Sequence, residues 1–283
     1  MFDPQPAHDF HGLRTLLRQL LGNDSALFDL SSLTDLILSQ PLVGTTVKVD
    51  SNETDPYAFL TVLNVNQHRE SNSALATLAD YLLEKSKANS KLHEELTRIL
   101  SVKGNGGKGK GEGSLGLILT ERMINMPVEV VPPMYKMLQE EVQWALDDKE
   151  PYNFDSYLVL SKTYTEVPSK LDADDDEEDE GLQKPKSKKF KSRMRQIPRR
   201  KEIEEGEGKG KEVFCFHLED EVLHQSAVAW TDFKYTKEQG PGAADSKRTF
   251  SELGIVTQGH MVLFKKEKLG EVVRKLESQF APS

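Results

Sequence analysis

The sequence is poor in cysteine and has no long apolar run. Its 283 residues include a single cysteine, Cys215, so the chain cannot form an internal disulfide bond. Such cysteine usage is typical of a reducing compartment, the cytosol or the nucleus. No apolar stretch approaches the ~20 residues that a membrane-spanning helix needs. The first residues, Met1-Phe2-Asp3, lack the basic and apolar regions of a signal peptide, so no contact with a membrane is predicted.

Catalytic signatures are also scarce. No H-E-x-x-H, G-x-S-x-G or protein-kinase motif occurs in the chain. Residues 104–116 contain seven glycines and two matches to G-x-G-x-x-G. A dinucleotide-binding loop follows a strand and opens a helix, whereas the apolar pattern here predicts a helix before the glycines and a strand after them. The segment is interpreted as a linker, and no catalytic, cofactor-binding or metal-binding residue is predicted.

The charges are unevenly distributed along the chain. The net charge is −9, yet residues 171–211 hold 12 acidic and 12 basic side chains, which leaves 34 acidic and 25 basic ones elsewhere. An acidic body favours basic partners and disfavours nucleic acid as the main ligand. An RNA-binding protein, the alternative, requires a basic patch on the folded surface.

Residues 169–211 are predicted to be a disordered acidic-then-basic insertion, because they contain too few apolar residues for a core. Residues 1–168 and 212–283 then form one folded domain. The acidic run is a candidate client-binding segment, made of Asp172, Asp174, Asp175, Asp176, Glu177, Glu178, Asp179 and Glu180. The basic cluster is typical of a nuclear-import signal, and it consists of Lys184, Lys186, Lys188, Lys189, Lys191, Arg193, Arg195, Arg199, Arg200 and Lys201. Two other interpretations of the charges remain, RNA-phosphate contacts and a solvated linker.

Apolar periodicity predicts helices alternating with groups of strands. Leucines at helical spacing follow Asp9, a candidate helix cap. Strands are predicted at "GTTVKV", "YAFLTVLNV", "LGLILT", "DSYLVLSKTYTEV", "EVFCFHLE", "VAWTDFKY" and "GHMVLFKK". In the fifth of these, Cys215 and His217 fall on one strand face, and the cysteine is interpreted as structural. Several strands follow one another without room for crossover helices, which predicts an α/β (α+β) three-layer domain with a mixed, largely antiparallel sheet.

Three blocks of the sequence resemble the BCCIP family, in particular its fungal branch. They are "DFHGLRTLLRQLL", "DPYAFLTVLNVNQH" and "LGLILTERMINMPVEVVPPMYKMLQEEVQWAL", and "YLVLSKTYTEV" matches as well. The family motif in the third block is assigned a structural role. Its residues here are Glu121, Arg122, Ile124, Asn125, Pro127, Pro133, Met134 and Tyr135.

The resemblance implies a domain like the GNAT acetyltransferase fold without that enzymatic activity. It also implies a nuclear protein that shuttles to the cytoplasm and acts as a chaperone and transport factor. The implied partners are a large-subunit ribosomal protein as basic client, a phosphoinositide kinase as export cargo, and the import and export machinery. Ribosome biogenesis, actin organisation and vesicular transport follow as implied roles. The long acidic N-terminal tail of the family is absent, which suggests a shortened N-terminus.

The segment after "LGLILT" tests the acetyltransferase alternative. In an acetyltransferase, the central strand ends in a loop whose backbone amides hold the pyrophosphate of acetyl-CoA. The corresponding residues here, "ERMINMPVEVVPP", contain no glycine and three prolines. Because proline has no N–H and the remaining residues are largely apolar, few amides are predicted to be free for a phosphate. We therefore expect a degenerate cofactor site, with no bound cofactor.

Overall fold

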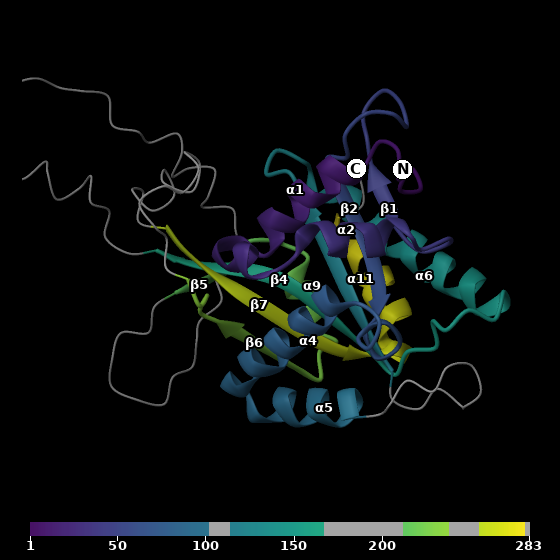
Figure 1. The fold of residues 1–283 in the computed structure, drawn as a ribbon. Helices are drawn as coiled ribbons and strands as arrows, with labels where there is room; N and C mark the ends of the chain where they lie inside the picture. Colours follow the sequence, from purple (N-terminus) through teal and green to yellow (C-terminus); the bar gives the residue numbers. More distant parts are fainter. Residues whose placement is uncertain (102–113, 167–211, 238–254, 281–283) are drawn as a thin grey trace, which may run out of the picture.

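A seven-stranded mixed sheet is the centre of the computed structural model, which describes residues 1–101, 114–166, 212–237 and 255–280 (Figure 1). β3 and β4 are parallel, and the other neighbours are antiparallel. β5 pairs with β4 beside the main order. The order across the sheet is β1 (Thr45–Val47), β2 (Ala58–Asn64), β3 (Leu115–Arg122), β4 (Ser156–Glu166), β7 (Ile255–Lys265) and β6 (Ala229–Phe233), and β5 comprises Val213–Cys215.

The single parallel pair needs a crossover, and α6 (Val131–Asp147) provides it between β3 and β4. Proline at the first positions of this helix fits its start, because the first-turn N–H groups have no partner inside the helix. The short 3-10 helix η3 (Val128–Val130) leads into α6. The family motif therefore extends from the end of β3, through the turn before η3, into the first turn of α6.

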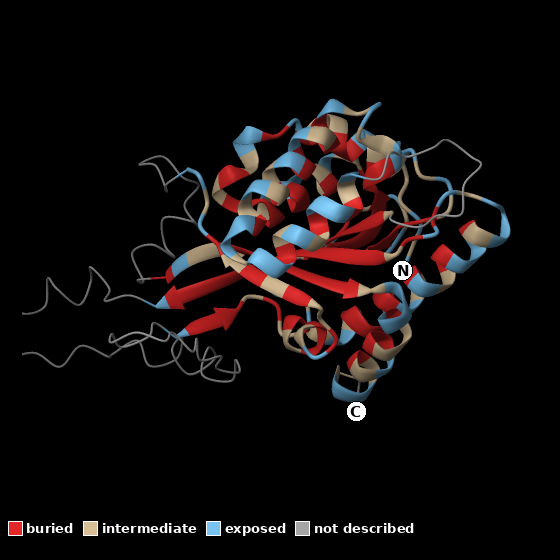
Figure 2. Cartoon of the chain, turned by 90° about the horizontal axis from the view of Figure 1, so that it is seen from below, coloured by how far each residue is buried: buried red, intermediate tan, exposed pale blue. Residues whose placement is uncertain are grey.

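Helices cover both faces of the sheet. One face packs against α1 (Phe10–Leu20), α2 (Leu30–Leu38), α4 (Ser73–Lys85) and α5 (Ser90–Ser101), and the other packs against α6, α9 (Asp220–His224) and α11 (Leu269–Phe280). Figure 2 shows the buried strands between the two helical layers, with exposed residues on the outer faces of the helices. Among the described residues, no helix is long and apolar enough to cross a bilayer.

The strands alternate between two cores. In β3, Leu117 and Leu119 belong to the core under α1, whereas Ile118 belongs to the core under α6. This two-residue period places successive side chains on opposite faces. Both faces are covered, so β2 is buried along its whole length and β4 along all but its last residue.

Short connecting elements complete the described chain. Two of them connect consecutive helices, α1 with α2 and α4 with α5, and the other two join β2 to α4 and β7 to α11. They are η1 (Gly22–Leu27), α3 (Val65–His68), η2 (Ser86–Ala88) and η5 (Lys266–Lys268).

The prediction of a mixed, largely antiparallel sheet with helices on both faces is confirmed. Two local predictions are wrong. The strand expected at "EVFCFHLE" ends at Cys215, so His217 does not share a strand face with it. Asp9 stands at the N-cap of α1, but its side chain forms no capping bond. Instead, the Asp9 carboxylate lies 2.7 Å from Lys48 Nζ and accepts a hydrogen bond from the backbone of Gln5.

Candidate functional site

The parallel strands β3 and β4 separate at one end of the sheet. Their pairing ends at Leu119 and Leu160, although β3 continues to Arg122 and β4 to Glu166. The chain segment 213–224 lies in the space between them. Its β5 part pairs with Thr163–Thr165 of β4, and the N–H of Phe216 donates to the carbonyl of Lys162 at 3.0 Å. The protein's own residues therefore occupy the opening between the strands.

A buried ion pair lies at the point of separation. The carboxylate of Glu121 accepts a hydrogen bond from Lys162 Nζ, and both side chains are almost fully buried. Lys162 Nζ also donates to the carbonyl of Gln19 at 3.2 Å and lies 4.6 Å from the ring centroid of Phe216. His217 Nε2 lies 3.1 Å from Glu121 Oε1. Burial alone raises the pKa of Glu121, but Lys162 and His217 outweigh it and hold this pKa at about 2.

Two further polar contacts connect segment 213–224 to the separated strands. The guanidinium of Arg122 pairs with both carboxylate oxygens of Glu219, one of them at 3.0 Å from Nη2. Such two-pronged contacts fix orientation as well as distance. Ser161 Oγ donates to Asp220 Oδ2 at 2.6 Å. Burial raises the pKa of Asp220 to about 6, against the opposing effect of the neighbouring His260 and His217.

A chain of imidazoles extends the polar cluster into β7. His260 is fully buried, and its Nδ1 lies 2.6 Å from Asp232 Oδ1. On its other side, His260 Nε2 lies 2.8 Å from His224 Nε2. The hydroxyl of Thr163 donates to the same Asp232 oxygen at 3.0 Å. Polar groups of β4, β6, β7 and α9 are thus joined in one buried network.

Three backbone amides of the turn after β3 are engaged within the protein. The N–H of Met123 donates to Tyr57, that of Met126 to Met123 and that of Val130 to Pro127. Pro127 itself has no N–H. These four positions cannot donate to a pyrophosphate, which is held by free amides at a strand–helix loop, and the degenerate cofactor site stays a prediction.

The structure divides the family motif into a buried and an exposed part. Glu121, Met134 and Tyr135 are buried, and Arg122 is partly buried in its pair with Glu219. In contrast, the side chain of Ile124 is 71% exposed. The other exposed members of the motif are Asn125, Pro127 and Pro133.

Several predicted residues lie outside the described chain. The acidic run 172–180 and the basic cluster 184–201 fall in the undescribed range 167–211, and most of the glycine segment falls in 102–113. Sequence reasoning missed the roles of Lys162, Glu219 and Asp220. A signal for Lys162 was available, because a lysine two residues after the apolar run "YLVL" of a predicted strand needs a partner if that strand is buried.

Comparison with known proteins identifies the family. The BCCIP family model matches residues 1–223. This chain belongs to the BCCIP family. Within that family, it is 48% identical to Protein bcp1 of Aspergillus fumigatus, over 99% of this chain and 86% of that protein. It is 43% identical to Protein bcp1 of Schizosaccharomyces pombe, over 97% of this chain and 86% of that protein.

A solved structure agrees with the family assignment. The crystal structure of BCP1 from Saccharomyces cerevisiae matches with a TM-score of 0.59 and 27% sequence identity. The match covers 98% of this BCCIP-family chain and 86% of the yeast chain. The predicted resemblance to the BCCIP family is therefore confirmed at the level of both sequence and fold.

Proposed function

We propose that this BCCIP-family chain is a non-enzymatic nuclear protein that chaperones and transports basic client proteins. A large-subunit ribosomal protein is the client that we propose first, with ribosome biogenesis and nuclear export as the processes served. A phosphoinositide kinase as export cargo is the further proposal, with actin organisation and vesicular transport as its consequences. In this proposal, the basic cluster directs the protein into the nucleus, and the protein is then exported to the cytoplasm.

The observation that carries this proposal is that side chains of the protein itself occupy the opening between β3 and β4. In open α/β sheets, ligands bind in a crevice at the carboxyl ends of the strands. In this chain, Glu121, Arg122 and Ser161 bind side chains of segment 213–224 across that opening. Charged groups already satisfied by the protein are poorly placed to bind a reacting substrate. A binding role for the fold is therefore favoured over acetyl transfer.

Charge supports a basic client. Outside residues 171–211 the chain carries 34 acidic and 25 basic side chains, and the acidic run adds eight carboxylates within nine residues. Opposite charge accelerates association and selects against wrong partners. An RNA-binding function requires the reverse charge on the folded body.

Affinity purification of the full chain from nuclear extract, followed by mass spectrometry, tests the client. The matched variant replaces each Asp and Glu of the acidic run 172–180 with Asn or Gln, which keeps size and removes charge. We expect basic proteins to be enriched with the parent chain and depleted with the variant. An identical set of bound proteins contradicts a role of the acidic run, and calorimetric binding of acetyl-CoA at micromolar affinity contradicts the non-enzymatic proposal.

A further inference from the structure

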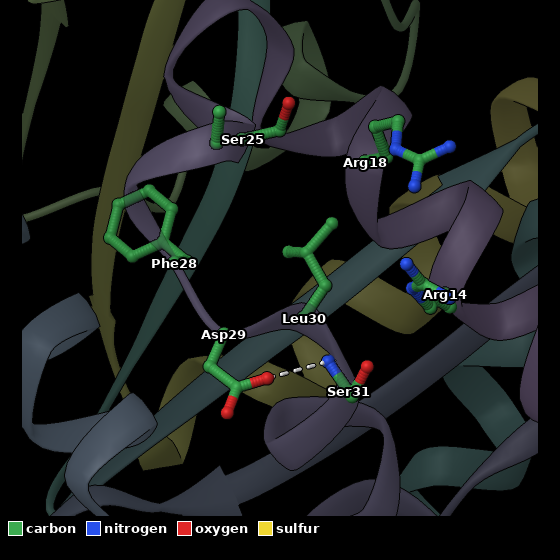
Figure 3. Close-up of a pocket in the computed structure, with 8 residues that line it drawn as sticks. Arg14, Arg18, Ser25, Phe28, Asp29, Leu30 and Ser31 are labelled. Atoms are coloured by element: carbon green, nitrogen blue, oxygen red, sulfur yellow. Dashed lines mark hydrogen bonds between the residues drawn. The ribbon is translucent and has the colours of Figure 1, made fainter.

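A hollow between α1 and α2 lies away from the separated strands. It has a volume of about 300 Å³. Arg14 and Arg18 of α1 contribute one side, and the loop and first residues of α2 contribute the other (Figure 3). The complete lining consists of Arg14, Arg18, Ser25, Ala26, Phe28, Asp29, Leu30 and Ser31.

The two arginines have no partner within the described residues. Neither guanidinium forms a hydrogen bond or salt bridge there, and Nε of Arg14 is buried without an acceptor. Spacing of four residues places both side chains on one face of α1. Two guanidinium groups on one helix face attract an anion locally, against the net negative charge of the chain as a whole.

The one carboxylate of the hollow is already engaged. Asp29 caps α2 and accepts hydrogen bonds at 3.1 Å from the backbone N–H groups of Ser31 and Ser32. The positive end of the helix therefore offsets its charge. Figure 3 shows the side chain of Leu30 between Asp29 and the two arginines. The arginines thus remain available to an external anion.

We propose that this hollow binds a peptide of a partner protein that carries a phosphorylated serine or threonine. The phosphoryl group lies between Arg14 and Arg18, with the hydroxyl of Ser31 as an additional donor. A phosphoryl dianion matches two guanidinium charges and offers three oxygens to their planar forks, whereas one carboxylate is satisfied by one arginine. Arginine clusters are a recurrent means of recognising phosphorylated peptides.

The apolar floor indicates a peptide rather than free phosphate. Leu30 and Phe28 line the hollow beside the arginines and keep 8% of their surface exposed. A volume of about 300 Å³ exceeds that of a phosphate ion and leaves room for a neighbouring apolar side chain. The proposal is independent of the basic client, because the hollow and the acidic run have opposite charge.

Nuclear magnetic resonance titration of the full chain tests the proposal. The probe is the blocked dipeptide acetyl-phosphoserine-leucine amide, followed through the Arg Nε–H signals and the amide of Ser31. The comparison probes are the serine and glutamate dipeptides and inorganic phosphate. We expect shifts at Arg14, Arg18 and Ser31, and binding of the phosphoserine probe about tenfold tighter than that of the glutamate probe.

Variants separate recognition from unfolding. Arg14→Gln with Arg18→Gln keeps the long side chains and is expected to weaken binding at least about tenfold, with unchanged thermal melting. Arg14→Lys with Arg18→Lys keeps the charge but loses the forked geometry and is expected to fall between parent and Gln variant. Arg274→Gln, on the exposed face of α11, is the matched control and should bind as the parent does.

Three results overturn the proposal. The first is the absence of shifts at Arg14, Arg18 and Ser31 at millimolar probe. The second is equal affinity for the glutamate and phosphoserine probes, which assigns the hollow to any anion. The third is equal affinity for inorganic phosphate and the phosphoserine dipeptide, which would show that the peptide part of the probe contributes nothing to binding.

Discussion

Glu121 and Lys162 form an ion pair whose side chains are 0% and 5% exposed, at the point where β3 and β4 stop pairing. The pair joins two strands that no longer share backbone hydrogen bonds. Through His217, it also holds segment 213–224 in the opening. At this end of the sheet, the contact between β3 and β4 therefore depends on buried charges rather than on pairing of these two strands.

Removing one member of this pair leaves a buried charge without its main partner. We expect Lys162→Met to lower the free energy of unfolding by about 3–5 kcal/mol in urea denaturation. The double variant Glu121→Gln, Lys162→Met should lose clearly less than the sum of the two single variants, because neither charge remains. Strict additivity would show that the two residues are not coupled.

The exposed pair Lys87 and Glu84 serves as a control for this experiment, since these side chains are 57% and 66% exposed. Lys87→Met should lower the free energy of unfolding by less than about 1 kcal/mol.

Asp220 gives the folded protein an unusual dependence on pH. Its folded pKa of about 6 lies above its ordinary value of 3.8, so between these values the folded chain holds a proton that the unfolded chain has released. Its contribution to stability is therefore complete below about pH 4 and is lost as the pH rises through 6. A shift of about two units corresponds to about 3 kcal/mol.

Asp220→Asn removes this titration and keeps an acceptor for Ser161. The free energy of unfolding of the variant, relative to the parent, should therefore rise by up to about 3 kcal/mol between pH 4 and pH 7. Urea denaturation of both proteins across this range measures the difference. Parallel curves would contradict the raised pKa of Asp220.

The hydroxyl of Tyr135 is buried and has no hydrogen-bond partner among the residues described in the structure. A buried, unsatisfied hydroxyl destabilises the fold by about 1–3 kcal/mol. We therefore expect Tyr135→Phe to raise the free energy of unfolding by about 1 kcal/mol. Tyr81→Phe is the matched control, because the Tyr81 hydroxyl donates to Asp24 at 2.7 Å, and it should lower stability instead. Equal effects of the two substitutions would refute this reasoning.

Nuclear import is predicted to depend on the basic cluster. Replacing Lys188, Lys189, Arg199, Arg200 and Lys201 with Ala removes half of its ten cations. Nuclear accumulation of a fluorescent fusion should fall, while the melting temperature stays the same because this cluster contains too few apolar residues to contribute to a core. Unchanged localisation in cells would exclude these residues as the import signal.

Local patterns predicted most of the regular structure. The leucines of α1 recur at helical spacing, and all of those from Leu13 to Leu20 are buried. The run "LGLILT" has the length and apolar character of a buried strand, and it forms most of β3. These elements were predictable because the spacing of their apolar residues is set by backbone geometry and by the two cores.

Segment 213–224 was not predictable in the same way. Its alternating apolar residues indicate a longer strand, yet the strand ends at Cys215, after which His217, Glu219 and Asp220 point to buried partners. These partners belong to β3 and β4, between 59 and 97 residues away along the chain. Bringing them together outweighs the local strand preference of Phe216 and Leu218, because an unpaired buried charge is far more unfavourable than a shortened strand.

The sequence by itself determined the helices, most strands, the two-sided burial of the sheet and the family, since each depends on residue type and spacing alone. Only the tertiary structure decided where β3 and β4 separate, which residues enter that opening, and that Arg14 and Arg18 face a hollow without a carboxylate partner among the described residues. Contacts of this kind depend on chain segments that are distant in sequence. The interaction energies of these contacts are large only where burial removes water from around the charges.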